Sequence, residues 1–229
     1  IKRKINLVKK MGLTNFSVDL IYGLPGQDLD ELTNDIKNIL KLNPPHISTY
    51  DLQIETNTVA FIKKWPKISD EESRLMYEKV VATLRNNGYK RYEVSNFARK
   101  NHESLHNKLY WHNLNYYAIG LGASGYINDK RYMITGGLTK YLKGERKIVE
   151  DIITKDVFIE EYLMLNLRLE DGFSLNDFKK RTGIDFLENY QSQIASLVEK
   201  SLVTYNKTHF HVTDEGMLLL DRVVLDLIS

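Results

Sequence analysis

The sequence contains no cysteine among its 229 residues. Disulfides, thiolate nucleophiles and zinc or iron–sulfur cluster sites built on cysteine ligands are therefore excluded within this chain. It also has no stretch of roughly 18 uncharged apolar residues that could span a bilayer, and its first residues lack the basic, apolar, small-residue order of a signal peptide. We expect a cytoplasmic protein.

The sequence lacks an initiator methionine and opens at Ile1 within an amphipathic run, IKRKINLVKKMG. We expect that an N-terminal portion precedes it. Hydrophobic residues make up 42% and charged residues 27%, the composition of a globular protein. The length fits one medium domain and one small domain, which we place at residues 1–150 and 151–229. The first part carries 24 Lys and Arg against 16 Asp and Glu, and the second carries 8 against 14, so their net charges differ in sign.

Helix and strand patterns alternate in the first part of the chain. Apolar residues at helical spacing predict a helix before Gly12, and β-branched and aromatic residues predict a strand at 16–22. Asp28 can cap a second helix, after which HISTYDLQIE at 46–55 predicts another strand. Strand, helix and strand with such loops form the βαβ unit of a parallel sheet.

The remaining pattern divides into three stretches. A helix is predicted over 70–87 and a strand over 89–98, and short strands with a hairpin tip at Asn128-Asp129 are predicted within 116–137. Beyond about residue 150 we predict three helices, a hairpin and a final helix: over 154–168, from Ser174, over 185–200, at 201–205 with 208–212, and from Asp214. This order resembles a winged-helix module.

Polar side chains occupy strand positions that are usually apolar. Strand residues alternate between two faces, and the second strand places Thr49, Asp51, Gln53 and Glu55 on one of them. Buried parallel strands are normally apolar runs, and an unpaired buried carboxylate costs on the order of several kcal/mol. We therefore expect Asp19 of the first strand and this row to line a shared cavity near the carboxyl ends of the strands. A structural ion pair or an exposed edge strand is the alternative.

Two glycine-rich stretches follow predicted strands. The backbone amides of GLPGQ at 23–27 could bind a ligand carboxylate or phosphate, although most Gly-Pro turns after strands are only turns. The glycines of IGLGASGY at 119–126 permit close backbone approach to a cofactor, or mark a bulge or a tight sheet corner. Neither stretch alone identifies a site.

Three histidines and two large aromatic residues gather in HESLHNKLYWHN at 102–113, a polar stretch without helical periodicity that predicts a loop. A neutral imidazole can ligate haem iron, aromatic neighbours can stack on a flat macrocycle, and nearby Arg99, Lys100 and Lys108 could bind propionates. The spacing matches no zinc pattern and by itself favours ordinary surface histidines.

A winged helix can place a helix in the DNA major groove. The net charge of −6 over 151–229 argues against this function, because attraction to phosphates supplies most non-specific affinity. We expect no nucleic-acid partner. Apolar residues of this region form its core or a docking face: Tyr162, Leu163, Leu165, Leu167 and Leu169.

Six segments together resemble the HemW branch of the oxygen-independent coproporphyrinogen III oxidase family. They are VDLIYGLPGQ, ISTYDLQIE followed by Thr58, YEVSNFA, HNKLYW, IGLGASGY and LMLNLRLEDG. Each is weak alone, but their order and spacing are specific, and the resemblance extends through essentially the whole chain.

The resemblance implies an α/β fold: the C-terminal part of a partial (β/α) TIM-like radical SAM barrel that continues into an extended sheet, followed by a small winged-helix-like domain. It also implies a four-iron four-sulfur cluster that binds S-adenosylmethionine. The family's CxxxCxxC motif is absent from this sequence. The cluster ligands would therefore lie outside this chain.

Site residues follow from the resemblance position by position. Asp19 matches the strand carboxylate that contacts S-adenosylmethionine, and Gln53 matches the position where the next strand approaches the same cofactor. HNKLYW fits the HNxxYW pattern of the haem-binding members, so His106 matches the ligand to haem iron. Asn107, Tyr110 and Trp111 complete that pattern.

The resemblance implies a haem chaperone that binds haem and delivers it to acceptor proteins, with membrane-associated partners. The alternative within the family is an oxygen-independent coproporphyrinogen III oxidase, which uses a radical for oxidative decarboxylation. A winged-helix nucleic-acid-binding protein is the alternative from another class. We predict no catalytic residue in this chain and no S-adenosylmethionine cleavage by these residues alone, because the electron source is absent.

Overall fold

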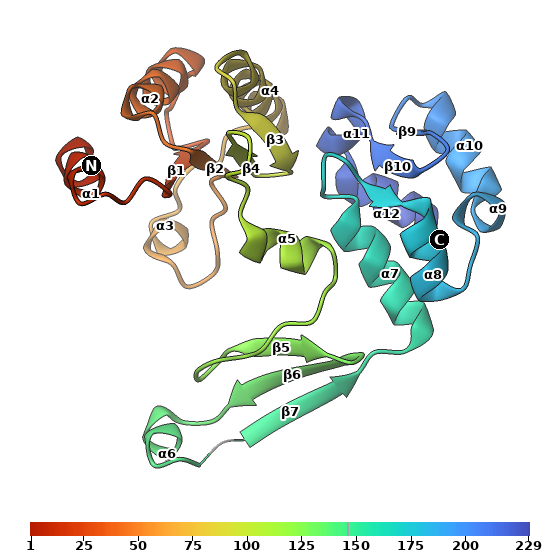
Figure 1. Ribbon diagram of the computed structural model, residues 1–229. Coiled ribbons are helices and arrows are strands. Elements are labelled where there is room, and N and C mark those ends of the chain that lie inside the picture. Colours follow the sequence, from red (N-terminus) through yellow and green to blue (C-terminus); the bar gives the residue numbers. More distant parts are fainter. Residues whose placement is uncertain (146) are drawn as a thin grey trace. The chain divides into compact units, whose positions relative to one another are not determined.

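The structure is a computed structural model that describes residues 1–145 and 147–229. Its contacts divide the chain into two compact units, Ile1–Glu103 and Ser104–Ser229. Each unit is described by itself and is called the first or the second unit below (Figure 1).

The first unit is built on a four-stranded sheet in the order β1-β2-β4-β3. Its strands are β1 (Ser17–Tyr22), β2 (His46–Asp51), β3 (Lys90–Glu93) and β4 (Asn96–Ala98). β1 and β2 pair in parallel, whereas β4 runs antiparallel to both β2 and β3. The predicted βαβ unit is confirmed.

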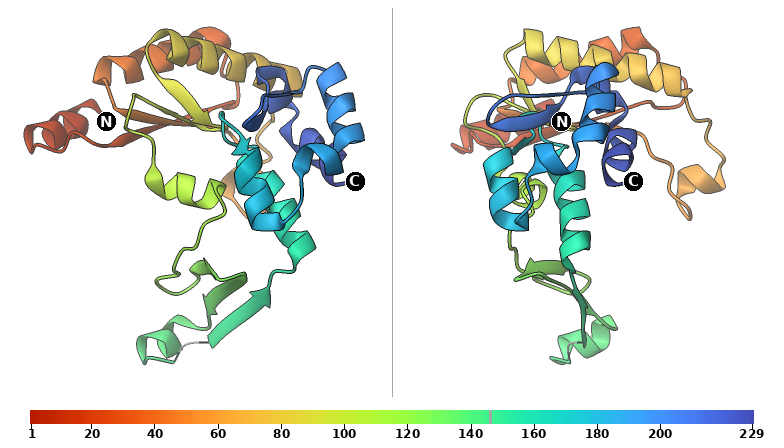
Figure 2. Two further views of the ribbon diagram at one scale, coloured as in Figure 1. Left: turned by 45° about the vertical axis from the view of Figure 1, so that its right-hand side comes forward. Right: turned by 90° about the vertical axis from the view of Figure 1, so that its right-hand side faces the viewer.

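Two helices cover the same face of this sheet, as the views in Figures 1 and 2 agree. They are α2 (Leu29–Leu42) and α4 (Asp70–Asn86), and the unit also contains α1 (Lys2–Lys10) and α3 (Val59–Ile62). α2 begins where predicted, because the Asp28 side chain accepts hydrogen bonds from the amides of Asp30 and Glu31. Ser69 and Glu72 form a capping box at the start of α4.

The core of the first unit lies between these helices and the sheet. Buried apolar residues of α2 and α4 meet those of the strands: Leu20, Tyr22, Leu32, Ile36, Ile47, Met76, Val80, Val81, Leu84, Tyr89 and Phe97. Burial of this apolar surface is the main term that stabilises the unit. One face of the sheet therefore packs against α2 and α4.

The single strand predicted over 89–98 is wrong in its extent. The segment forms a tight antiparallel hairpin, β3 and β4, that reverses at Val94-Ser95. The aromatic and β-branched residues of this segment predicted a strand, and the turn within the segment was missed. The turn is stabilised by tertiary contacts, in which the Thr49 amide and hydroxyl both donate to the Ser95 carbonyl.

The second unit contains a three-stranded antiparallel sheet in the order β5-β6-β7. Its strands are β5 (Ser124–Ile127), β6 (Lys130–Thr135) and β7 (Lys147–Ile152). The predicted hairpin tip is confirmed, since Asn128 and Asp129 have φ angles of 50° and 60°, as a two-residue hairpin turn requires. The sequence did not predict β7. The short helix α5 (Leu105–Trp111) precedes this sheet in the chain, and the short helix α6 (Leu138–Leu142) lies between β6 and β7.

The rest of the second unit is a helical region with a small sheet in the order β8-β10-β9. Its helices are α7 (Lys155–Asn166), α8 (Leu175–Thr182), α9 (Phe186–Asn189), α10 (Gln191–Glu199), α11 (Asp214–Leu218) and α12 (Leu220–Ile228). Its strands are β8 (Phe173–Ser174), β9 (Val203–Tyr205) and β10 (His209–Val212). The predicted hairpin is confirmed, and two of the predicted helices are each interrupted once, at Tyr190 and Leu219.

Aromatic side chains form the core of this region. The Phe173 ring lies 4.9 Å from Phe186 and 5.6 Å from Phe210, measured between ring centroids, and Tyr162 packs edge-on against Phe173. All four are buried, so the apolar residues of α7 serve the core. The mixed α/β class is confirmed. The predicted domain boundary after residue 150 lies inside the second unit, and the division into domains 1–150 and 151–229 stays a prediction.

Candidate functional site

The first candidate site lies on the face of the first sheet that points away from α2 and α4, called the Asp19 face below. The strand register pairs Ser17 with His46 and Asp19 with Ser48. Ser17 Oγ is hydrogen-bonded to His46 Nδ1 at 2.8 Å and to Ser48 Oγ at 3.2 Å, so these four residues share one face. The Asp19 side chain is exposed on it.

His46 is the buried centre of the Asp19 face. Its Nε2 is hydrogen-bonded to Tyr92 Oη at 2.9 Å, so both ring nitrogens have hydroxyl partners. Only 6% of the residue is exposed, and burial lowers the pKa of the imidazole below 6.5 despite the opposing charges of Asp19 and Glu103. His46 is therefore neutral at neutral pH.

The row that was expected to share a cavity with Asp19 lies on the opposite side of the sheet. Tyr22, which faces the core, pairs with Asp51, and Asp51 Oδ2 accepts a hydrogen bond from Ser73 of α4 at 2.8 Å. Thr49 is buried on the same side. The expectation was wrong because periodicity assigns alternate faces within one strand, whereas the register decides which faces of two strands coincide.

Gln53 lies beyond β2, which ends at Asp51. It lines a cavity of about 130 Å³ with residues that follow both strands, including Gly23, Asp51, Lys67 and Asp70. Within the described residues, the lining of this cavity does not include Asp19. Asp19 and Gln53 therefore do not share this cavity.

The GLPGQ segment is a closed turn. The amides of Gly23 and Leu24 both donate to Gln27 Oε1, at 2.9 and 3.4 Å. Gly23 has a φ of 75°, and a Cβ there would lie 2.6 Å from Asp51 Oδ1. These two amides serve the turn itself, which favours the structural alternative for this segment.

The second candidate site is α5 in the second unit, which carries the HNKLYW segment. The predicted loop is wrong, because residues 105–111 form a helix capped by Ser104, whose Oγ accepts from the Asn107 amide at 3.2 Å. Seven residues are fewer than two full turns, too few for helical periodicity to be visible in the sequence. His106 is exposed, and His102 lies in the first unit, where Nδ1 is hydrogen-bonded to Asn15 Oδ1.

A row of aromatic side chains extends from His106 toward β5. The His106 and Tyr110 rings, one helical turn apart, meet edge to face at 4.8 Å between centroids, and Tyr110 meets Tyr116 at 4.5 Å. Tyr116 is held by paired backbone hydrogen bonds to Tyr126. The imidazole is therefore exposed at the end of a fixed aromatic row.

Asn107 and Trp111 also lie one turn apart, on the neighbouring side of α5. The Arg168 guanidinium lies over the Trp111 ring at 5.8 Å. Trp111 Nε1 is buried and has no partner among the described residues. Arg99, predicted as a partner for propionates, lies in the first unit, where it stacks on Tyr89 and donates to Asn43 Oδ1.

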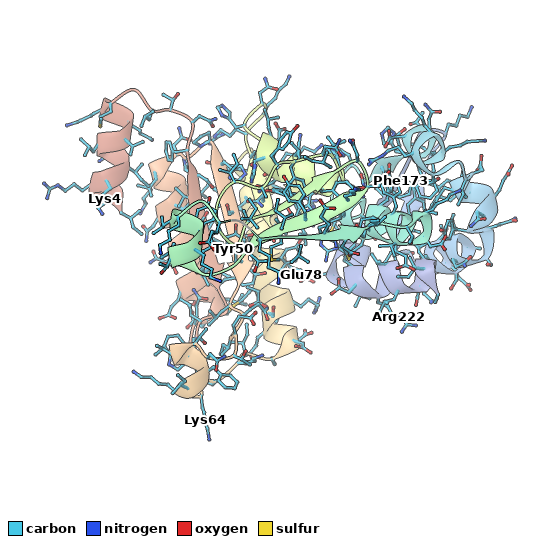
Figure 3. The ribbon with its side chains drawn as sticks, turned by 90° about the horizontal axis from the view of Figure 1, so that it is seen from below. Lys4, Tyr50, Lys64, Glu78, Phe173 and Arg222 are labelled. Carbon is cyan, nitrogen blue, oxygen red and sulfur yellow. The ribbon has the colours of Figure 1, made fainter. Side chains whose placement is uncertain are left out.

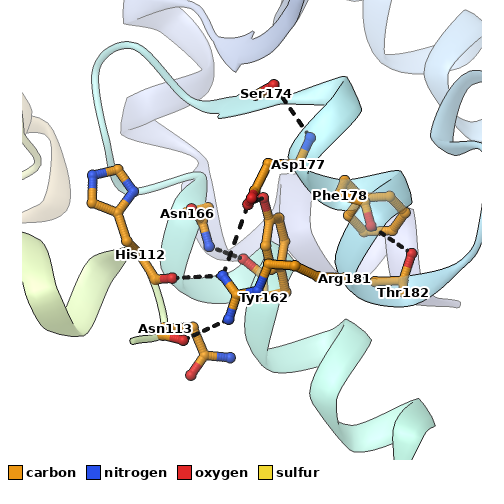
Figure 4. A network of polar contacts seen from close by, with 9 residues as sticks. All are labelled: His112, Asn113, Tyr162, Asn166, Ser174, Asp177, Phe178, Arg181 and Thr182. Atoms are coloured by element: carbon orange, nitrogen blue, oxygen red, sulfur yellow. Dashed lines mark hydrogen bonds and ion pairs between the residues drawn. The ribbon is translucent and has the colours of Figure 1, made fainter. Parts of the chain in front are cut away.

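One residue near α5 was missed by the sequence analysis. Arg181 of α8 donates to the backbone carbonyls of His112 at 2.8 Å and Asn113 at 2.6 Å, at the C-terminal end of α5 (Figure 4). Nothing in the local sequence points to this contact, since the partners are 69 and 68 positions apart. Burial lowers the pKa of the His112 imidazole.

These two sites differ in what they can bind. Among the described residues no group of three or more His, Asp or Glu could hold a metal ion, but an axial ligand to haem iron requires only one exposed imidazole. His106 meets that requirement, with aromatic rings beside it that can pack on a macrocycle. A carboxylate such as Asp19 can accept hydrogen bonds from hydroxyl and ammonium groups of a ligand. None of the described helices has the length and apolar character needed to cross a bilayer.

The structure and the sequence are both similar to known proteins. The fold matches the solved structure titled "Coproporphyrinogen III oxidase (HemN) from Escherichia coli is a Radical SAM enzyme", with a TM-score of 0.80 at 18% identity, over 100% of this chain and 58% of that one. Residues 153–219 match the family model described as the HemN C-terminal domain.

Curated relatives named "Heme chaperone HemW" match almost the whole chain. The protein of Lactococcus lactis is 36% identical over 226 residues, covering 96% of this chain and 60% of its own length, and that of Bacillus subtilis is 33% identical over 94% and 59%. The protein of Escherichia coli is 30% identical over 97% and 60%. This chain thus spans about 60% of the length of these relatives. Over nearly its whole length, the chain is therefore similar in sequence to the proteins named HemW.

Proposed function

We propose that this chain is the haem-binding part of a HemW-type haem chaperone and that His106 is the ligand to haem iron. The observation that carries the proposal is the exposed His106 imidazole at the end of an aromatic row on a short, capped helix. Asn107, Tyr110 and Trp111 support it by fixing the ring orientation and offering apolar surface. The names of the curated relatives support it as well.

S-adenosylmethionine is the second cofactor of the proposal. Asp19 would contact it from the exposed Asp19 face, and the backbone near Gln53 would approach it from the end of β2. A four-iron four-sulfur cluster would need ligands from outside this chain, which contains no cysteine. S-adenosylmethionine would supply its chemistry only together with that cluster. We therefore assign Asp19 and Gln53 a role in binding and orienting it, and no reaction step.

The finer architecture is part of the same proposal. The first unit would form late strands of a partial (β/α) barrel, with α2 and α4 outside and the Asp19 face toward the lumen. Residues 151–229 would form a winged-helix-like domain that serves protein contacts, because their net charge of −6 disfavours nucleic acid. Haem-acceptor proteins, including membrane-associated ones, are the proposed partners, and the cytoplasm is the proposed location.

The test is a titration of the chain with haemin, followed by the Soret absorbance. We expect saturable binding at one haem per chain. His106→Ala should weaken it more than roughly tenfold, because even residues that only orient a metal ligand contribute about 10- to 100-fold. His209→Ala, which removes another exposed imidazole, is the matched control and should bind normally. Equal binding by His106→Ala and the unchanged chain would refute the assignment.

A decarboxylase is the competing function within the family. Full-length protein with its cluster, assayed with coproporphyrinogen III, separates the two: turnover to protoporphyrinogen would favour the enzyme. The haem chaperone predicts stoichiometric haem binding without turnover.

A further inference from the structure

We propose that Arg181 is a positioning residue for the haem ligand: it fixes the C-terminal end of α5 and thereby the direction in which His106 points. This inference rests on the proposed function. It also gives the region matched as the HemN C-terminal domain a defined role, since Arg181 lies within residues 153–219.

The first argument is the hydrogen bonding at the end of α5. The last carbonyls of any helix have no partner within the helix, and a helix as short as α5 is unstable alone. The carbonyls of His112, the C-cap residue of α5, and of Asn113, the first residue beyond the cap, accept from the two terminal nitrogens of Arg181 (Figure 4). A planar guanidinium makes such a paired contact in one fixed geometry, and its positive charge is favourable at a helix C-terminus.

The second argument is that Arg181 is itself held in place. Its guanidinium lies 5.1 Å from the ring centroids of both Phe158 and Tyr162, and Asp177 Oδ2 is 3.8 Å from Nη1. Tyr162 in turn donates to Asp177 Oδ2 at 2.9 Å. Only 23% of the arginine side chain is exposed. The anchor therefore belongs to the packed core of the C-terminal helices and has little freedom of its own.

The third argument is the turn that follows α5. Asn113 has a φ of 49°, in the left-handed region, and is buried. Ser104 caps the other end of the helix. Both ends of α5 are thus fixed, one by the Ser104 cap and the other by Arg181 of α8.

The consequence is a dependence of His106 on a residue far away in the sequence. Without Arg181 two carbonyls lose charged donors, the last turn of α5 loosens, and the His106 and Tyr110 rings lose their fixed edge-to-face geometry. A merely structural arginine would instead affect the whole second unit alike. The two roles can be distinguished by the residues whose amide hydrogen exchange becomes faster and by whether the ligation of the haem iron changes.

The experiment compares Arg181→Gln and Arg181→Lys with Arg222→Gln in the same 229-residue chain. Arg222 is the matched control, since it extends from α12 with a side chain 70% exposed and forms an ion pair with Asp226 (Figure 3). Amide hydrogen exchange, read by mass spectrometry without haem, reports on residues 105–113 and on α10 and α12. Haemin titration and the Soret spectrum report on affinity and axial ligation.

We expect Arg181→Gln to speed exchange in residues 105–113 at least about tenfold while α10 and α12 stay near the unchanged chain, because charged hydrogen bonds are the strong kind. Haem affinity should fall roughly tenfold, and added imidazole should restore the low-spin Soret spectrum by replacing the misplaced His106. Arg181→Lys should restore little of the protection or the haem affinity, since a single ammonium group cannot reproduce the paired hydrogen bonds of the planar guanidinium. Arg222→Gln should change neither readout.

The outcomes separate this inference from the function on which it rests. Unchanged exchange in α5 of Arg181→Gln, with haem binding still lost in His106→Ala, overturns the positioning role alone. A uniform rise of exchange through the whole second unit also overturns it. Normal haem binding by His106→Ala refutes the proposed function. Even then, faster exchange confined to α5 in Arg181→Gln would establish Arg181 as the residue that fixes this helix.

Discussion

The two candidate sites are held in place by different means. Asp19 lies on a strand whose other face is fixed by the buried core between the sheet and α2 and α4. His106 lies on a seven-residue helix with no buried residue of its own, held at one end by Ser104 and at the other by Arg181. A strand site therefore depends on the core of its unit, whereas the helix site depends on a few polar contacts.

The largest expected effect comes from the core beneath the Asp19 face. Ile36→Ala removes a fully buried side chain of α2 and should lower the free energy of unfolding of the first unit by about 3 kcal/mol, from lost burial and the cavity left behind. Urea denaturation followed by far-UV circular dichroism measures it. Ile148→Ala on β7, where 54% of the residue is exposed, is the control and should cost well under about 1 kcal/mol. Similar losses in both variants would contradict the comparison.

A smaller and local effect is expected at the start of α5. Ser104→Ala removes the side chain that accepts from the Asn107 amide and should destabilise this helix by about 1 kcal/mol. Amide exchange of residues 105–111 measures it, and global unfolding should hardly change. Ser192→Ala, an exposed serine within α10, is the control. Equal protection of α5 in Ser104→Ala and the unchanged chain would mean that Arg181 alone fixes the helix.

The smallest effect is a pH dependence of the first unit. Burial lowers the pKa of His46 in the folded protein, so between that pKa and 6.5 the unfolded chain binds a proton that the folded chain does not. The free energy of unfolding should therefore decrease as the pH falls through 6.5, and the contribution of His46 is complete above it. Denaturation at pH 7.5 and 5.5 measures the difference. His46→Gln should reduce it, and an unaltered pH dependence in this variant would exclude His46 as the source.

Local chemistry was predictable from the sequence where a signal is contained within a few residues. The Asp28 cap, the Asn128-Asp129 tip and the Ser174 cap are all confirmed at their predicted positions. β7 was not predicted, because every residue of this strand is exposed and no face of it is marked by burial. The turn at Val94-Ser95 was missed because tertiary contacts stabilise it.

The sequence by itself determined the resemblance to HemW-type proteins, the mixed α/β class, most element positions and the residue types available for chemistry, including the absence of cysteine ligands. Only the tertiary structure decided that Asp19 and Asp51 lie on opposite faces of the sheet and that Arg181 holds the helix of His106. The physical reason is that caps and turns depend on neighbours in the chain. Register and side-chain anchoring depend on residues tens of positions apart, whose contact is settled by packing of the whole unit.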